Sequence, residues 1–477
     1  MQPRLWILLS FLAFGGSCSE LVAEGPAPSA SSSVPRYQFA VGEQLTYAED
    51  QEIPLLDKPA DKRRRNREDR WQIFVLNQNS DGSWRLLLYR TVRLVDQKPN
   101  SRPSEIFANS MLAYCDLFPD GRIPPNPTLG DSFDFQINPY WLFAPLPPNQ
   151  DSMAKGWSGT SPVGERTLDC SLTSGTPGSS IVINCAEHTP LLVIFGQTKR
   201  RRYVFDRQAG KFRQIEQDDT RNDGKIHSQS GSTVKLESDS QKPSRWIEQL
   251  GKEADQFFAT TADYQKQMDV VQRIRTAKDC ETELLRARQL LATAQKSSEL
   301  ELVRDAYRAQ LKVHDREAPW KVNEAKARAK VYSRGPADWE LTAFDGAKHR
   351  LKDYRGKVVV LDFWYRYCPY CIKNFPQIKQ VAERYRDKGV VVLGMNIDPK
   401  EDDARFVIRE KGLAFTNLRA ERAVSAYAAD ELGFPVLYIL GQDGRVSDIH
   451  SGYSPDLANH VSDTIDRLLR ESPAQAR

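Results

Sequence analysis

The feature that most constrains the fold is a short segment in the last third of the chain that carries two cysteines. Residues Val358 to Phe363 form a strongly apolar run with the length of a buried strand, and Cys368 and Cys371 follow shortly after it. A helical pattern begins near Cys371 and continues to Tyr385. Two thiols spaced Cys-x-x-Cys at a helix start after a strand are typical of a dithiol–disulfide centre. The remaining segments are therefore expected to deliver this centre to its compartment, to position it, or to select its partners.

Length and composition limit the class of protein. At 477 residues the chain is too long for one ordinary hydrophobic core, so roughly two to four folded units are expected. An apolar fraction of 40% and a charged fraction of 27% are typical of soluble globular proteins rather than disordered or membrane-embedded ones. The net charge of +4 predicts no nucleic-acid partner. Basic runs at 62–67 and 199–202 are interpreted as solvated loop or strand-edge charges, with phosphate or lipid binding as the alternative.

The N-terminus has the pattern of an export signal. Arg4 precedes an apolar run, Leu5 to Phe14, that is too short to span a bilayer, so we predict a signal peptide over residues 1–18. The run ends near a sequence that resembles a bacterial lipobox, which would place a lipid anchor on Cys18, but an ordinary cleavage site at 21–23 competes with it. Residues 19–36 are rich in Ala, Pro, Ser and Gly and predict a flexible tether. Both cleavage sites predict an exported chain in an oxidising periplasmic or other extracytoplasmic compartment.

Residues 37–238 have the alternating patterns of a β-rich domain, expected as a mainly antiparallel sheet or half-barrel. A turn at 79–82 joins two long strand-like runs, and a second turn is expected at 208–211. A proline-rich stretch at 119–148 predicts a long ordered loop. No catalytic, metal-binding or phosphate-binding pattern occurs in this domain. The predicted strands lie within 71–76, 84–95, 180–184, 191–195, 202–205 and 233–236.

Residues 244–333 have the apolar spacing of helices. A first helix is expected over Trp246 to Ile274, a second around Cys280 to Ala294, and a third around Leu300 to Leu311. We interpret the region as an α-helical hairpin or three-helix spacer packed on its neighbours. An intermolecular coiled coil is the alternative.

After Gly335-Pro336 the pattern changes to alternating strands and helices, which predicts a separate α/β unit over 336–472. This unit resembles the TlpA-type extracytoplasmic thioredoxin-like oxidoreductases, and the likeness covers under a third of the chain. Several ordered motifs carry it, and together they are more specific than the cysteine pair alone. They are the segments 339–348, 351–364, Cys368-Pro-Tyr-Cys371, 391–398, 433–440 and 443–445.

The resemblance and the local chemistry together assign roles to three side chains. Cys368 is expected to be the attacking thiol, because a helix N-terminus stabilises a thiolate. Cys371, one turn inside the helix, is expected to resolve the mixed disulfide. By resemblance, Asp362 is the buried acid that accepts the proton of Cys371. The alternative for Asp362 is a strand-end carboxylate satisfied by backbone donors.

The resemblance also implies which residues position the substrate. Pro435 aligns with the family's cis-proline, which faces the dithiol and presents backbone to the substrate, and Phe434 precedes it. Pro369 and Tyr370 form the dipeptide that tunes the redox potential. Tyr367 stands where the family usually has Trp, and Asn374 where many members have Glu. These departures leave the direction of electron flow open, with a moderately reducing centre as the expectation.

Other interpretations of the cysteines are less consistent with the sequence. Haem attachment would need His at position 372, where Ile372 stands, and structural zinc would need further ligands nearby. A purely structural Cys368–Cys371 disulfide is kept as an alternative. Cys170 and Cys185 are expected to form a structural disulfide. Cys280 is expected to be a buried small hydrophobe, and Cys115 has no assigned partner unless it pairs with Cys280.

The sequence therefore predicts a multidomain chain with an N-terminal β-rich domain, a central helical spacer and a C-terminal thioredoxin-like α/β fold. The leading hypothesis is an extracytoplasmic thiol–disulfide oxidoreductase, acting reductively on protein disulfides. A membrane electron donor would re-reduce it, because no reductase domain, metal-binding pattern or cofactor motif is recognised. The first alternative is an envelope binding or structural protein that uses an inert thioredoxin-like module for docking. A thiol peroxidase is the weaker alternative, because the Pro-x-x-x-Thr-x-x-Cys pattern is absent around Cys368.

Overall fold

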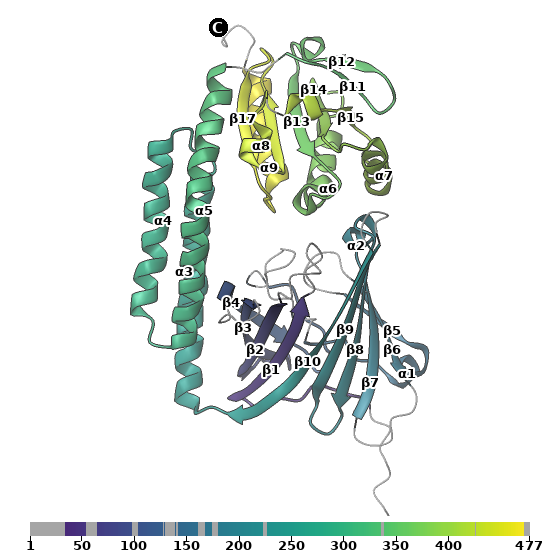
Figure 1. The fold of residues 1–477 in the computed structure, drawn as a ribbon, viewed down its shortest axis with the longest axis vertical. Coiled ribbons are helices and arrows are strands. Elements are labelled where there is room, and N and C mark those ends of the chain that lie inside the picture. Colours follow the sequence, from purple (N-terminus) through teal and green to yellow (C-terminus); the bar gives the residue numbers. More distant parts are fainter. Residues whose placement is uncertain are drawn as a thin grey trace, which may run out of the picture.

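A computed structural model describes residues 34–471, except for 54–63, 98–103, 127, 129–138, 140–141, 161–166, 174–179, 223–226, 335–337 and 425. The predicted signal peptide, Cys18 and most of the predicted tether lie outside the described residues. The described chain has three parts (Figure 1). A β-sheet occupies one end, an α/β unit the other, and three long helices join them along one side.

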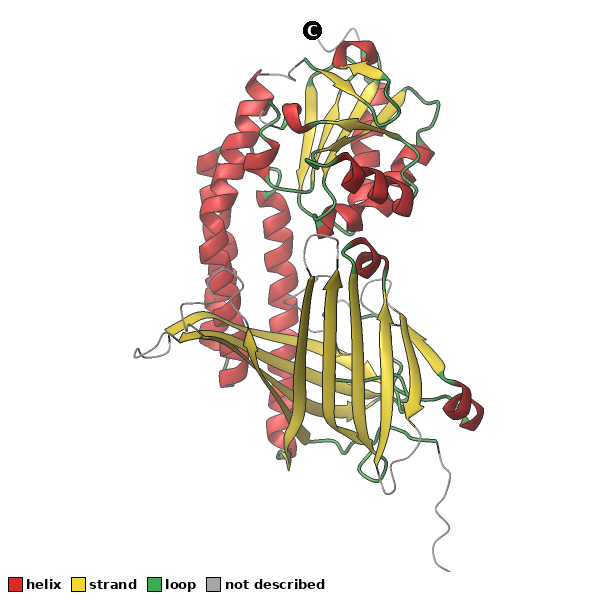
Figure 2. Cartoon of the chain, turned by 45° about the vertical axis from the view of Figure 1, so that its right-hand side comes forward, coloured by secondary structure: helices red, strands yellow, loops and turns green. Residues whose placement is uncertain are grey.

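The first part is one sheet in which all neighbouring strands are antiparallel and the strand order is β4-β3-β2-β1-β10-β9-β8-β7-β6-β5. The sheet is strongly curved, which is consistent with the half-barrel considered from the sequence (Figure 2). The turn at 79–82 lies between β2 and β3 as predicted, and Asn79 N–H donates to the Ser83 carbonyl at 2.8 Å. The strands are β1 (Glu43–Ile53), β2 (Arg64–Gln78), β3 (Trp84–Gln97), β4 (Ser104–Leu117), β5 (Trp157–Thr160), β6 (Thr167–Thr173), β7 (Ser180–His188), β8 (Gln197–Asp206), β9 (Lys211–Asn222) and β10 (His227–Gln241), and the short helix α1 (Gln150–Lys155) precedes β5.

Both faces of strands β2 to β4 are buried, which explains their nearly continuous apolar sequences. Ile73 and Val75 point into a core on one face of the sheet, together with Trp71 and Tyr37. Alternate residues such as Phe74 point to the opposite face, against the helices. The sheet is therefore held from both sides, and the helical part is packed directly on it.

One predicted strand is wrong. Residues 191–195 were expected to be β, but Pro190–Ile194 form a short helix, α2, in the connection between β7 and β8. A short apolar run has no periodicity that distinguishes a strand from a single helical turn. Proline at the start of this run favours the helix, because its fixed φ suits the first helical position. Ile194 is only 1% exposed, since α2 packs against the α/β unit rather than into the sheet.

The helical part consists of α3 (Ser244–Val271), α4 (Ala277–Ser297) and α5 (Glu301–Arg334). Their apolar faces pack on the sheet and on one another within the chain. This packing explains the helical spacing of apolar residues for which an intermolecular coiled coil was the alternative. Helix α5 extends far beyond the apolar residues that predicted it and continues through Pro319. No helix in the described part of the chain is long and apolar enough to cross a membrane.

The C-terminal α/β unit has a five-stranded central sheet with the order β15-β14-β13-β16-β17. Strands β13, β14 and β15 are parallel, while β16 and β17 are antiparallel to their neighbours. Apolar clusters cover both faces of this sheet. The elements are β11 (Glu340–Thr342), β12 (Lys348–Arg350), β13 (Val358–Trp364), α6 (Pro369–Arg384), β14 (Val390–Asn396), α7 (Glu401–Lys411), β15 (Thr416–Arg419), α8 (Ala429–Leu432), β16 (Val436–Leu440), β17 (Val446–Ser451) and α9 (Leu457–Arg470).

Helix α5 contributes to the cores of two parts of the molecule. Near its N-terminus, Tyr307 packs among residues of β2, β3 and β4. Near its C-terminus, Ala327 and Val331 belong to the core of the α/β unit. Between them, Arg328 is 1% exposed and donates to the Ser451 hydroxyl at 3.2 Å and to the Ile274 carbonyl at 3.1 Å. One rigid helix thus fixes the position of the α/β unit relative to the sheet.

We predict that Arg328→Ala lowers the free energy of unfolding in urea by about 3–5 kcal/mol, because it leaves the buried Glu324 carboxylate without its Arg328 partner. Lys330→Ala is the matched control. Lys330 also joins α5 to the α/β unit through Glu431, but that ion pair is about half exposed, with side chains 49% and 47% accessible. Its loss should cost less than about 1 kcal/mol. Equal losses in the two variants would contradict the role given to Arg328.

Candidate active site

The two cysteines lie where strand β13 passes into helix α6. Cys368 is the N-cap residue of α6, and Pro369 occupies the first turn, where its missing N–H removes no helical hydrogen bond. The structure joins Cys368 and Cys371 in a disulfide with a Cα–Cα distance of 5.2 Å. The Cys371 N–H points at the Cys368 sulfur at 3.1 Å. A thiolate on Cys368 would therefore receive a hydrogen bond as well as the field of the helix N-terminus.

Asp362 is an isolated buried acid on the strand that leads into the dithiol. It is 2% exposed, and its Oδ2 atom has no hydrogen-bond partner among the described residues. Burial raises the pKa of this carboxyl group to about 7, because no nearby cation offsets its lost hydration. A carboxyl group with this pKa can both accept and release a proton near neutral pH.

The peptide bond between Phe434 and Pro435 is cis. The Pro435 carbonyl accepts a hydrogen bond from Gly452 N–H at 2.8 Å, which ties this loop to the residue after β17. Neither the N–H nor the carbonyl of Phe434 is hydrogen-bonded to any residue that the structure describes. These two groups are available to an extended chain laid beside them.

The residues flanking the cysteines face two different surroundings. The Tyr367 ring stacks on Phe195 of the β-sheet part, with ring centroids 6.4 Å apart. The Tyr370 side chain is 37% exposed and stacks on Tyr453, with centroids 6.1 Å apart. The structure therefore does not bring Tyr367 and Tyr370 together but directs them to opposite sides of the dithiol.

Helix α2 of the β-sheet part covers the dithiol on the Tyr367 side. Ile194 belongs to the same apolar cluster as Cys368 and Cys371, which are 2% and 1% exposed. Arg366 donates to the Ile194 carbonyl from Nε at 3.2 Å and from Nη2 at 3.0 Å. The same guanidinium also forms a 2.7 Å ion pair with Asp403. Sequence reasoning missed Ile194 and Arg366, because a contact between segments 172 residues apart leaves no local pattern.

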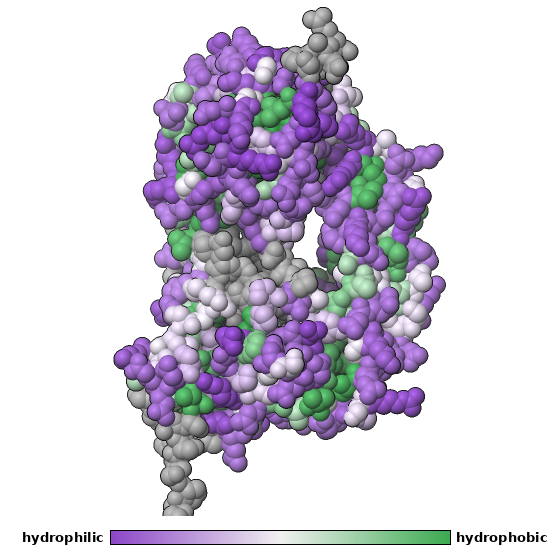
Figure 3. All heavy atoms as spheres, turned by 180° about the vertical axis from the view of Figure 1, so that it is seen from behind, coloured by the Kyte–Doolittle hydropathy of each residue, from purple (hydrophilic) through white to green (hydrophobic). Residues whose placement is uncertain are grey.

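A cleft of about 1150 Å³ lies on the Tyr370 side of the dithiol. One wall is the α/β unit, including Pro435, and the other is the helical part, including Trp320 of α5. Figure 3 shows the molecule hollowed between these two parts, with an opening that passes through in this view. The cleft was not predicted, since it exists only where the separate parts meet.

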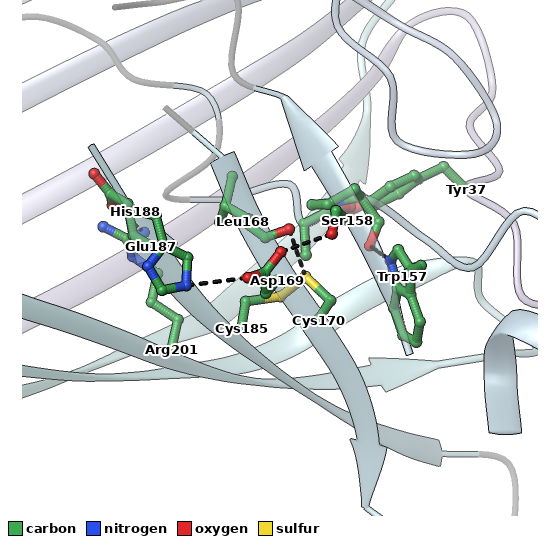
Figure 4. The surroundings of a disulfide bond; sticks show 12 residues. Tyr37, Trp157, Ser158, Leu168, Asp169, Cys170, Cys185, Glu187, His188 and Arg201 are labelled. Atoms are coloured by element: carbon green, nitrogen blue, oxygen red, sulfur yellow. Dashed lines mark hydrogen bonds and ion pairs between the residues drawn. A yellow bond between two sulfur atoms is a disulfide. The ribbon is translucent and has the colours of Figure 1, made fainter. Parts of the chain in front are cut away.

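The predicted Cys170–Cys185 disulfide is present and joins β6 to β7, far from the dithiol in the sequence (Figure 4). Close by, Arg201 and Glu187 form a buried ion pair at 2.9 Å.

Cys115 and Cys280 are both free and are buried in different apolar clusters, so the disulfide considered between them does not form. Within the described ranges, no three His, Cys, Asp or Glu side chains gather as a metal site would require.

A sequence model described as the AhpC/TSA family matches residues 334–449. The thiol–disulfide oxidoreductase ResA of Geobacillus thermodenitrificans is 33% identical over 141 residues, a match covering 28% of this chain and 79% of that protein. ResA of Geobacillus kaustophilus is 34% identical with the same coverage. A crystal structure assigned to a thiol:disulfide interchange protein DsbE from Chlorobium tepidum is 28% identical and covers 28% of this chain and 95% of that chain, with a TM-score of 0.27. Through its C-terminal domain, the chain belongs to the thioredoxin-like thiol–disulfide oxidoreductases related to ResA.

Proposed function

We propose that this protein is an extracytoplasmic reductase of protein disulfides that works through Cys368 and Cys371. The observation that carries the proposal is the Cys368–Cys371 pair itself, which begins helix α6 six residues beyond the buried acid Asp362. The family of the C-terminal domain supports disulfide chemistry. The Phe434–Pro435 loop supports a polypeptide substrate, since its open backbone groups suit an extended chain.

The reaction can be written as two exchanges. The Cys368 thiolate attacks one sulfur of the substrate disulfide, forms a mixed disulfide and releases the other sulfur as a thiolate. Asp362 then accepts the proton of Cys371, and the Cys371 thiolate attacks the Cys368 sulfur. The substrate leaves with two thiols, and two electrons have passed from the enzyme dithiol to the substrate. An external electron donor, proposed to lie in the membrane, must reduce the Cys368–Cys371 disulfide before the next cycle; no cofactor is required.

The reducing direction is proposed from the residues around the cysteines. Pro369 and Tyr370 give the dipeptide found in glutaredoxins, whose potentials lie near about −200 to −230 mV. Tyr367 and Asn374 add to the departures from the family pattern. We infer a moderately reducing centre that donates electrons to less stable substrate disulfides.

The location is proposed from the N-terminal segment alone. An apolar run behind a basic residue would direct export, and either lipidation of Cys18 or soluble release would follow. Both outcomes place the dithiol in a compartment where disulfides form.

Replacing each cysteine separates the two exchanges. Cys368→Ser should abolish the reduction of insulin disulfides, because the attacking sulfur is gone. Cys371→Ser should retain the first exchange and accumulate a mixed disulfide on Cys368, visible by mass spectrometry and removed by dithiothreitol. Insulin reduction that survives Cys368→Ser would refute the proposal.

Asp362 should give the oxidised protein a distinctive pH dependence. Below pH 4 the carboxyl group is protonated in both the folded and the unfolded states. Between about pH 4 and pH 7 only the folded state holds the proton, so stability falls as pH rises and is level above pH 7. One pKa unit corresponds to 1.36 kcal/mol, so the free energy of unfolding should fall by roughly 4 kcal/mol across this window.

Asp362→Asn should remove this decline in urea titrations at pH 4 and pH 8. The same substitution should slow resolution by Cys371 about 100-fold near neutral pH, because the proton acceptor is lost. A decline of the same size in the variant would show that the carboxyl group does not have the raised pKa.

The cover formed by α2 should limit access to Cys368. Ile194→Ala removes apolar contact worth roughly 1–2 kcal/mol and should speed alkylation of Cys368 by iodoacetamide about tenfold in the reduced protein. Val193→Ala is the matched control, since Val193 is the neighbouring residue and is 60% exposed. Equal alkylation rates in the wild type and both variants would show that α2 does not restrict access.

A further inference from the structure

The helical part places an aromatic side chain beside the cis-proline loop. Trp320 of α5 lines the cleft, and its indole lies 3.5 Å from the position that a side chain on Gly433 would occupy. Gly433 precedes Phe434, whose backbone groups are open. Trp320 is also 50% exposed, although large apolar side chains in folded proteins are usually buried. Trp320 is thus an accessible aromatic residue in the lining of the cleft, beside the loop where a substrate chain would pass.

The orientation of the Trp320 indole is fixed by polar side chains of the same helix, α5. Its indole N–H donates to the Glu324 carboxylate at 2.6 Å. Glu324 is only 2% exposed and is also contacted by Lys321 at 3.1 Å and by Arg328 at 3.5 Å. A buried carboxylate held by two cations gives the indole one stable position. The ring is therefore set in place before any substrate arrives, which lowers the entropic cost of binding.

The opposite wall of the cleft is also aromatic. Tyr370 and Tyr453 stack there, and the Lys373 ammonium lies 4.2 Å from the centroid of the Tyr453 ring. At about 1150 Å³, the cleft is only slightly larger than cavities of roughly 300–1,000 Å³ that hold small ligands. A short extended segment can enter a space of this size, whereas a folded domain cannot.

We propose that Trp320 forms a substrate subsite that selects extended, disulfide-bearing polypeptide segments with an aromatic or large aliphatic side chain close to the reactive cysteine. This inference rests on the proposed function and deepens it. The segment lies against Phe434 with its backbone, and its apolar side chain packs on the Trp320 indole. The specificity of the dithiol then depends on Trp320, a residue of α5 that precedes the segment 334–449 matched by the family model.

The test compares three substrates of the full-length reduced protein. One is an unstructured disulfide peptide with Phe two residues from each cysteine, the second is the same peptide with Ser in place of Phe, and the third is 5,5′-dithiobis(2-nitrobenzoate). In single-turnover reactions with the substrate in excess, Trp320→Ala should raise the apparent KM for the Phe peptide about tenfold with little change in the maximal rate constant. The Ser peptide and the small disulfide should react within about twofold of the wild-type rates.

Two further variants separate recognition from structural damage. Trp320→Phe should restore most of the affinity for the Phe peptide, because it returns an aromatic surface to the subsite. Leu285→Ala is the matched control, since Leu285 is a 67% exposed apolar residue of α4 that does not line the cleft. It should leave all three reactions unchanged.

The inference is overturned if Trp320→Ala leaves KM for the Phe peptide unchanged. It is also overturned if all three substrates slow equally, because Trp320 then does not discriminate between substrates with and without the aromatic side chain. A wild-type protein that reduces none of the three substrates would instead refute the proposed function. The two failures are therefore distinguishable.

Discussion

The arrangement of the molecule depends on helix α5, which is shared by two hydrophobic cores. Its 34 residues span about 50 Å at 1.5 Å per residue, so its two ends lie in different parts of the chain. Tyr307 packs beside the large sheet, while Ala327 packs within the thioredoxin-like domain. To separate these parts, the molecule would have to expose apolar surface at one end of the helix. The helical region is therefore a rigid support rather than a loose linker, and both the cleft and the α2 contact depend on it.

This support places the dithiol between two unlike surfaces. On one side Ile194 and Phe195 of the β-sheet part lie against the segment before Cys368. On the other side Trp320 and Tyr370 face the open cleft. A thioredoxin-like domain alone would have neither boundary. Beneath the cysteines, Asp362 keeps an unpaired oxygen in an apolar interior, a local cost in stability of the kind that folded proteins tolerate at reactive sites.

Local sequence chemistry could predict part of this picture. The β13 strand, the helix start at Cys368 and the hairpin after Asn79 follow from periodicity and turn residues. The cis bond before Pro435 came only from family resemblance, because the physics of an isolated X–Pro bond favours trans. The helix at 190–194 and the continuation of α5 through Pro319 were not predictable, since packing against distant segments outweighs local propensity. Arg366, Ile194 and Trp320 could not be identified for the same reason, because their roles arise between domains.

The burial of Cys115 and Cys280 has a consequence for the chemistry of a protein that carries out thiol exchange. Both thiols are fully buried, and burial raises the pKa of each above its ordinary value. A neutral, inaccessible thiol cannot attack a mixed disulfide. In the proposed mechanism, Cys371 is therefore the only thiol among the described residues that competes for an adduct on Cys368. Within the described part of the chain, the fold thus keeps these two thiols out of the proposed exchange.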